Sequence, residues 1–250
     1  MKIIGIIPAR YGSTRFPGKP LADICGRPMI WWVYTQAKKT TKLSEVIVAT
    51  DDSRIADICT RYSIPYIMTA VSHATVTSRI HEVATRMKAD LYLVINGDEP
   101  LISKDVIEAV IPDNFNKDDY YIGNLMTKIK SAPEVVDFTN IKVVIDVNSN
   151  AMFMSRSPIP YPKASIEYSY YKHLGIIIYN MKALEFYVTH KRSYNESIED
   201  VDYLRFLDNG VKVKMTEVNA ESLSVDNYKD LEHVRLVIKD KLDNGVLSIQ

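Results

Sequence analysis

Short apolar runs alternate with amphipathic segments over the first part of the chain. The runs are rich in β-branched residues and predict strands at Ile3–Ile7, Val46–Thr50, Tyr66–Met68 and Leu91–Ile95. The segments between them have helical spacing and predict helices over Pro28–Lys39, Asp52–Tyr62 and Thr77–Met87. This alternation predicts an α/β fold with a mostly parallel central sheet and helices on both faces.

The pattern becomes mixed after Ile102. It predicts strands at Tyr120–Met126, Ile141–Ile145, Ala151–Met154 and His173–Tyr179, and helices at Ser197–Leu207 and Asn227–Lys239. No repeat, low-complexity stretch or linker marks a boundary. We therefore expect one domain over residues 1–250, with a lobe or insertion within about 115–195 that covers the site.

Composition narrows the class of partner. Lys plus Arg and Asp plus Glu each number 31, so the formal net charge is zero and no overall basic field attracts nucleic acid or a membrane. Cys25 and Cys59 have no zinc-type spacing and fit a reducing compartment. The apolar start ends at Pro8, too early for a signal peptide or a membrane span. These features predict a cytoplasmic protein that binds a small anion through a local cluster.

In parallel sheets the site lies beyond the carboxyl ends of the strands. The first loop there runs from Pro8 to Pro20 and contains Arg10, Arg15 and Lys19. Three cations with interspersed glycines suit a triphosphate, although an ordinary solvated basic loop is the alternative. It is not a Walker A loop, because its glycines are spaced differently and Pro20 replaces the metal-binding hydroxyl residue.

Several acidic residues are candidates for the same site or for helix caps. Asp98 comes directly after a predicted strand, where it could bind Mg²⁺ or start a turn. Asp52 is expected to be a helix N-cap. Asp226 precedes the last predicted helix, and its position alone favours an N-cap over a second metal ligand. His73 and His173 are isolated, and we expect both to be hydrogen-bonded structural residues rather than zinc ligands.

Five segments together resemble the 3-deoxy-manno-octulosonate cytidylyltransferase family, also called CMP-Kdo synthetases. They occur in the family's order and extend over almost the whole chain. The segments are 6–21 (IIPARYGSTRFPGKPL), 48–52 (VATDD), 97–102 (GDEPLI), 153–161 (FMSRSPIPY) and 171–176 (YKHLGI). The resemblance implies a nucleotide-diphospho-sugar transferase fold of the GT-A, Rossmann-like type and a homodimer.

The resemblance also implies a reaction: the hydroxyl of an acidic acceptor attacks the α-phosphorus of CTP, and pyrophosphate leaves without a covalent enzyme intermediate. Roles then follow for matching positions. Those implied to surround the nucleotide are Arg10, Ser13, Arg15, Lys19, Thr75, Arg79 and Asn96. Those implied to bind Mg²⁺ are Asp98 and Asp226. Those implied to line the acceptor pocket are Ser155, Arg156, His173, Asp202 and Tyr203. Arg10, Arg15, Lys19 and Asp98 would be the catalytic residues.

The chain departs from the family pattern near the nucleoside and the acceptor. Val76 stands for a glycine, Ser78 for an acid, Asn96 for a glutamine, and Asp202–Tyr203 for a Glu-Gln pair. A β-branched residue resists glycine-only backbone, so Val76 is expected to change the local path. The acceptor-side changes predict an acceptor other than Kdo itself. Candidates are an amino-substituted or otherwise modified 2-keto sugar acid, or a smaller carboxylate or phosphonate.

Two other functions use similar features. A non-catalytic nucleotide-binding protein would keep the fold, but it has no need of two separately placed acids. A metal-dependent glycosyltransferase would also place an acid at a strand end, but the cationic first loop favours a triphosphate over a diphosphate-sugar. Fold alone does not decide among the three.

Overall fold

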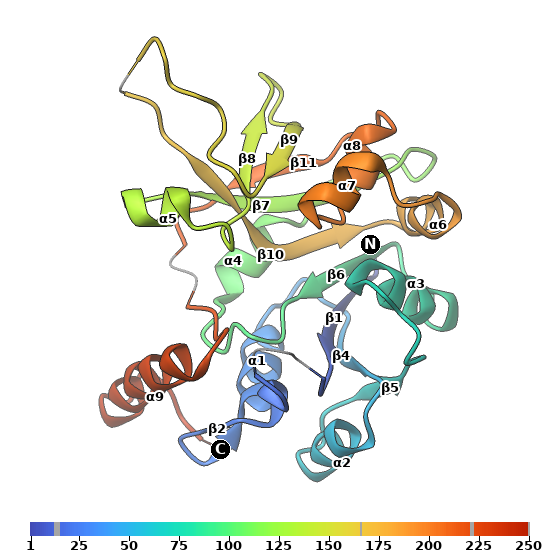
Figure 1. The fold of residues 1–250 in the computed structure, drawn as a ribbon. Helices are drawn as coiled ribbons and strands as arrows, with labels where there is room; N and C mark the ends of the chain where they lie inside the picture. The colour runs from blue at the N-terminus through green and yellow to red at the C-terminus, as the bar shows by residue number, and fades with distance from the viewer. Residues whose placement is uncertain (13–15, 166, 221–222, 250) are drawn as a thin grey trace.

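The computed structural model describes residues 1–12, 16–165, 167–220 and 223–249 (Figure 1). Among them, nine strands form one sheet in the order β11-β7-β10-β6-β1-β4-β5, with β8 joined to β10 and β9 joined to β8. Their bounds are β1 Ile3–Ala9, β4 Glu45–Thr50, β5 Tyr66–Met68, β6 Leu91–Ile95, β7 Ile122–Lys128, β8 Lys142–Ile145, β9 Ala151–Ser155, β10 Tyr171–Tyr179 and β11 Lys214–Glu217. The hairpin of β2 (Asp23–Ile24) and β3 (Arg27–Pro28) is separate.

The N-terminal half of the sheet is parallel. β1 pairs in parallel with β4 and with β6, and β4 pairs in parallel with β5. β10 then lies antiparallel to both β6 and β7. The α/β fold with a mostly parallel sheet is therefore confirmed, and the antiparallel β10 brings residues far along the chain beside the end of β6.

Helices cover both faces of the sheet, as predicted. The helices are α1 Met29–Ala37, α2 Ser53–Arg61, α3 Val76–Arg86, α4 Lys104–Ala109, α5 Ala132–Val136, α6 Met181–Thr189, α7 Tyr194–Glu199, α8 Leu204–Asp208 and α9 Tyr228–Asp243. In β1, Ile3 and Ile7 pack into the core beneath α1, α2 and α9, whereas Ile4 and Ile6 pack beneath α3, α6 and α8. Because successive side chains point to opposite faces, one fully apolar strand serves two cores.

The predicted helix over Ser197–Leu207 is wrong in its extent. Two short helices, α7 and α8, occupy this region, and they are separated by a connection that contains Asp202 and Tyr203. α7 ends at Asp200, whose φ of 52° and ψ of 52° are left-handed. Aspartate tolerates this conformation better than most residues because its short side chain bonds locally. The break turns residues 200–203 towards the site instead of along a helix.

Elements that the sequence pattern did not predict include α4, α5, α6 and β11, and α9 continues beyond Lys239 to Asp243. None of the described helices is both long and apolar enough to cross a membrane. The β8–β9 pair and the loop that follows it extend upward from the main sheet (Figure 1). That this region acts as a lobe covering the site stays a prediction.

A buried ion pair connects the carboxyl end of β4 to α3. The Arg79 side chain has no exposed surface, and its Nη2 donates to Asp51 Oδ2 at 2.5 Å. Arg79 Nη1 also donates to the hydroxyl of Thr69. A buried guanidinium that lost its carboxylate would remain as an uncompensated charge. Asp51 therefore belongs to the framework on which the site is built.

Replacing Asp51 with alanine should lower the free energy of unfolding by about 3–5 kcal/mol, because the Arg79 charge stays buried without its partner. Urea denaturation followed by circular dichroism measures this change. Asp57, which is exposed on α2, provides the matched control, and Asp57→Ala should change the same free energy by less than about 0.5 kcal/mol. Equal losses in the two variants would contradict the assignment.

Candidate active site

Three adjoining cavities open at the carboxyl end of β6. The first, of about 270 Å³, is lined by the loop after β1 and includes Arg10 and Lys19. The second, of about 470 Å³, lies between Asp98 and Lys172. The third, of about 560 Å³, extends under the α7–α8 connection. Asn96 lines all three, so the residue directly after β6 stands where they join.

Lys19 connects three remote segments at this junction. Its Nζ donates to Asp98 Oδ2 at 2.8 Å and to the carbonyl oxygen of Val225 at 2.9 Å, and it lies 3.7 Å from Asp226 Oδ1. The Val225 amide donates to the Asp98 carbonyl oxygen at 2.9 Å, which fixes the C-terminal segment against the loop after β6. The predicted phosphate-binding lysine and the two predicted metal carboxylates therefore form one cluster.

This cluster fits a hard divalent cation. Asp98 Oδ1 is buried and has no hydrogen-bond partner among the described residues, so one carboxylate oxygen is left for a ligand. No group of three or more His, Cys, Asp or Glu side chains that could hold a metal occurs in the described part of the chain. Mg²⁺ does not require such a group, because it is commonly held by one or two carboxylates together with waters and substrate phosphates.

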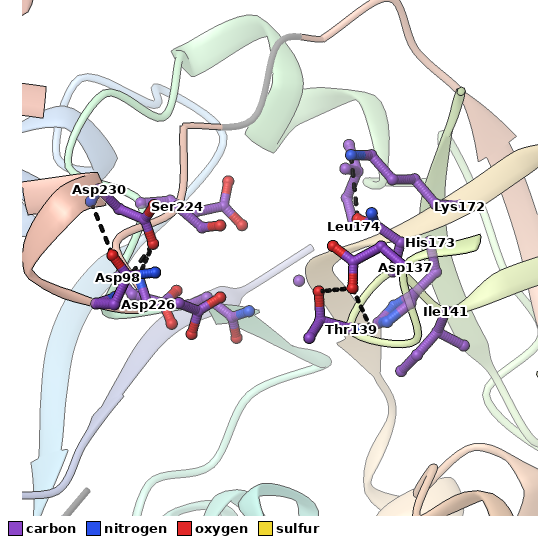
Figure 2. A pocket seen from close by; sticks show the side chains of 15 residues that line it. Asp98, Asp137, Thr139, Ile141, Lys172, His173, Leu174, Ser224, Asp226 and Asp230 are labelled. Atoms are coloured by element: carbon purple, nitrogen blue, oxygen red, sulfur yellow. Dashed lines mark hydrogen bonds between the residues drawn. The ribbon is translucent and has the colours of Figure 1, made fainter. Parts of the chain in front are cut away.

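Figure 2 shows the second cavity, with two facing walls. Asp98, Asp226 and Asp230 form one wall, and Asp137 and Lys172 lie on the other. Lys172 Nζ is 3.0 Å from the carboxylate of Glu134, so its charge is paired. Neither Asp137 nor Lys172 was predicted as a site residue. Asp137 ends α5 and Lys172 lies in β10, so the fold brings them to this wall from two segments remote from β6.

Asp226 is not the N-cap of α9, contrary to the expectation from its position alone. The cap is Asn227, whose Oδ1 accepts from the amides of Lys229 and Asp230. Asp230 in return accepts from the Asp226 and Asn227 amides, completing a capping box. The Asp226 carboxylate is therefore not needed to cap the N-terminus of α9. Asp52, by contrast, is the N-cap that was predicted, accepting from the Arg54 amide at 2.9 Å.

Arg10 lies at the edge of the first cavity, and its Nη2 donates to the carbonyl oxygen of His73. Burial, and then the nearby Arg79 guanidinium, lower the pKa of Arg10 below its usual value. Ser13 and Arg15, the other predicted phosphate-binding residues of this loop, lie outside the described residues.

The segment 75–79 differs from the expectation in two ways. Thr75 is the N-cap of α3, and Val76 is its first helical residue, so the backbone there does not need glycine. Val76 instead lies between the first and third cavities, where its side chain takes up space. Arg79 is fully buried and engaged by Asp51 and Thr69, so in this conformation it supports the wall rather than facing a ligand.

His73 is hydrogen-bonded as expected, through Ser78 and Glu82. At His173 the Nδ1 atom is buried and has no hydrogen-bond partner among the described residues. The ring lines the second and third cavities. Burial lowers the pKa of His173 to about 4, so the imidazole is neutral at pH 7. His173 is therefore a neutral group on the acceptor side of the cleft.

Asp202 and Tyr203 both line the third cavity, as the acceptor-side prediction requires. Thr77 Oγ1 donates to Asp202 Oδ2 at 3.0 Å, and the Tyr203 ring packs edge-on against His173 with centroids 5.6 Å apart. Burial raises the pKa of both the Asp202 carboxyl and the Tyr203 hydroxyl. The two residues that depart from the family pattern thus meet the cavity directly.

Arg156 is engaged with the backbone. Its Nε, Nη1 and Nη2 donate to the carbonyl oxygens of Glu199, Phe138 and Asp200 at 2.7, 3.0 and 3.1 Å. Arg156 is not among the residues that line the third cavity. Ser155 beside it donates to Glu199 Oε1. In this structure these two residues hold the end of α7 in place, and their contact with an acceptor stays a prediction.

Comparison with known proteins agrees with this architecture. The cytidylyltransferase family profile matches residues 4–215. A 3-deoxy-manno-octulosonate cytidylyltransferase of Fusobacterium nucleatum is 42% identical, with 96% of this chain and 98% of that protein covered. The corresponding protein of Trichlorobacter lovleyi is 38% identical, with 94% and 98% covered. A solved CMP:2-keto-3-deoxy-manno-octonic acid synthetase complexed with CTP superposes with a TM-score of 0.90 at 36% identity, covering 96% of this chain and 100% of that one.

The Rossmann-like sheet, with lysine and carboxylates gathered at its carboxyl edge, is that of a nucleotidyltransferase. The chain belongs to the cytidylyltransferase family. Both the family resemblance and the enzyme class expected from the sequence are confirmed.

Gly175 in β10 makes room for Asn96. A Cβ added there would lie 1.7 Å from Asn96 Nδ2 and 2.4 Å from its Cγ. Gly175→Ala should therefore lower the free energy of unfolding by about 1–3 kcal/mol through overpacking. In an Asn96→Ala background the same change should cost much less, since the clashing atoms are gone. Additive losses in a denaturant double-mutant cycle would show that Asn96 does not occupy this space.

The low pKa of His173 makes stability depend on pH. An unfolded histidine binds its proton near pH 6.5, whereas native His173 does so only near pH 4. Between these values the unfolded state binds more protons, so the free energy of unfolding falls as the pH drops. The loss between pH 7 and pH 5 should be smaller in His173→Gln than in the wild type. His233→Gln, at an exposed position on α9, should retain the wild-type loss in the same urea titrations.

Proposed function

We propose that this chain transfers CMP from CTP to the hydroxyl of a Kdo-like 2-keto sugar acid and releases pyrophosphate. The observation that carries the proposal is the contact of Lys19 with Asp98, Asp226 and Val225 at the junction of the cavities. A cation for the phosphates and two acids for a metal are all within one cluster. Relatives of the chain are named for this activity, and one was solved with CTP.

The residues of the cluster would have separate roles in the transfer of CMP. Lys19 and Arg10 line the first cavity, where they would neutralise charge that develops on the phosphates as the bond to pyrophosphate breaks. Asp98 and Asp226 would hold Mg²⁺. The ion would supply charge neutralisation between the acceptor hydroxyl and the phosphate. The acceptor hydroxyl would be the nucleophile and pyrophosphate the leaving group, so the proposed transfer needs no covalent enzyme intermediate.

The third cavity would hold the acceptor. Its volume of about 560 Å³ suits a sugar acid better than a small phosphonate, and its walls carry hydroxyl, amide and carboxyl groups that can bind hydroxyls. Asn96, Asp202 and Tyr203 line it, so they would determine which acid fits. A modified 2-keto sugar acid remains part of the proposal for this reason. Mg²⁺ dependence, a homodimer and a cytoplasmic location stay predictions.

Pyrophosphate release is the test. Purified protein with Mg²⁺ should release pyrophosphate from CTP faster than from ATP, GTP or UTP, and only with an acid from a panel of Kdo, 8-amino-Kdo, neuraminate-type acids and small phosphonates. Lys19→Met should lower kcat by about 10²–10³ fold, because a preorganised charge at the phosphates is lost. Lys42→Met, at an exposed position before β4, is the control and should retain full activity.

The other functions give different results in the same assay. Release of a nucleoside diphosphate from a nucleotide sugar would indicate a glycosyltransferase. CTP binding without turnover of any acid in the panel would favour a non-catalytic nucleotide-binding protein. Turnover with a phosphonate alone would move the acceptor class away from sugar acids.

A further inference from the structure

Three arginines belong to the segments next to the third cavity, two of them in its wall, and they differ in how their guanidinium groups are hydrogen-bonded. They are Arg156 after β9, Arg192 in the α6–α7 connection and Arg205 in α8. An acidic acceptor in this cavity needs a cation for its carboxylate. The existing contacts of each arginine indicate which one can supply it.

The guanidinium group of Arg205 is hydrogen-bonded inside the protein. Its Nε and Nη2 donate to both carboxylate oxygens of Glu196 at 2.8 and 2.6 Å, and Nη1 donates to the carbonyl oxygens of Tyr187 and His190. The Glu196 side chain is 1% exposed, so this pair is buried and bidentate. Its charge is therefore compensated within the fold.

The guanidinium group of Arg156 is hydrogen-bonded to the backbone. It donates to three carbonyl oxygens in two separate segments and is not part of the cavity wall. Moving it towards a ligand would leave these carbonyl oxygens without their donors, which costs free energy. His173, which does line the cavity, is neutral at pH 7 and cannot supply the charge.

Arg192 lines the cavity with half of its side chain exposed. Its Nη2 donates to Asp200 Oδ1 at 2.5 Å and, at 3.3 Å, to the carbonyl oxygen of Glu196. Nε is 3.8 Å from Glu196 Oε1, beyond hydrogen-bond distance. Nη1 has no hydrogen bond to any described residue. Most of the donor edge of Arg192 is thus available to a ligand.

We propose that Arg192 binds the carboxylate of the acceptor acid and thereby selects acidic acceptors, a role that rests on the proposed function. The carboxylate would replace Asp200 as the partner of the guanidinium. Asp200 is 80% exposed, and such exposed ion pairs contribute little to stability. A ligand carboxylate inside the cavity can accept two parallel hydrogen bonds from the guanidinium and is shielded from water. The exchange therefore favours the ligand.

The experiment measures steady-state kinetics of pyrophosphate release with CTP and the acid that the wild type uses best. Arg192→Met should raise KM for the acid by about tenfold to a hundredfold, as expected for loss of a charge-assisted hydrogen bond, and leave KM for CTP within about twofold. Lys191→Met is the matched control, since this exposed neighbour lies outside the cavity, and both constants should stay unchanged.

Asp200→Asn separates ligand binding from a purely structural role. If Arg192 exchanges partners, removing the competing carboxylate should lower KM for the acid or leave it unchanged. If the Arg192–Asp200 pair only supports the α6–α7 connection, Asp200→Asn should raise KM as Arg192→Met does, and the proposal is overturned. A carboxamide analogue of the acid adds a second measure, because its KM should be insensitive to Arg192→Met.

The proposed function and the role of Arg192 fail in different ways. A wild type that turns over no acid with CTP removes the proposed function itself. A wild type that is active, together with an unchanged KM for the acid in Arg192→Met, removes only the role of Arg192. In that case a raised KM in Arg156→Met would assign the carboxylate to Arg156.

Discussion

The contact of Lys19 with two acids is the interaction on which the site depends. Lys19 follows β1, Asp98 follows β6, and Asp226 precedes α9, so the cluster joins three parts of the chain that share only their place at one sheet edge. Like charges on Asp98 and Asp226 would repel without a cation between them. The single Lys19 ammonium offsets part of this repulsion in the free protein, and a bound divalent metal would offset more of it.

How far the sequence predicts this structure depends on how local the determining interactions are. The strands β1, β4 and β6 follow from apolar, β-branched runs, because a strand buried on both faces leaves a continuous pattern. The loops after β1 and β6 follow from the same topology. Asn227 was missed as the cap of α9 because Asp226 and Asn227 are both good capping residues, and only the backbone geometry separates them.

The acceptor side was less predictable because it is assembled from remote pieces. Thr77 and Asp202 are 125 residues apart and meet through one hydrogen bond. The break between α7 and α8 depends on a left-handed aspartate, which no hydrophobic period reveals. Arg79 was expected at the nucleotide because its segment matches one of the family, yet its pairing with Asp51 buries it. Arg192 lies in the connection between α6 and α7, where no hydrophobic periodicity or motif indicates a site residue.

The position of Asp226 has a consequence for synthesis of the protein. Among the described residues, every strand of the sheet ends by Glu217, and the second carboxylate of the cluster comes only after it. A chain that stalls or is cut between these points contains all the strands but lacks one of the acids that face Lys19. Completion of the sheet and completion of the charge cluster therefore depend on different parts of the chain, and a fragment that contains every described strand still lacks an acid of the site.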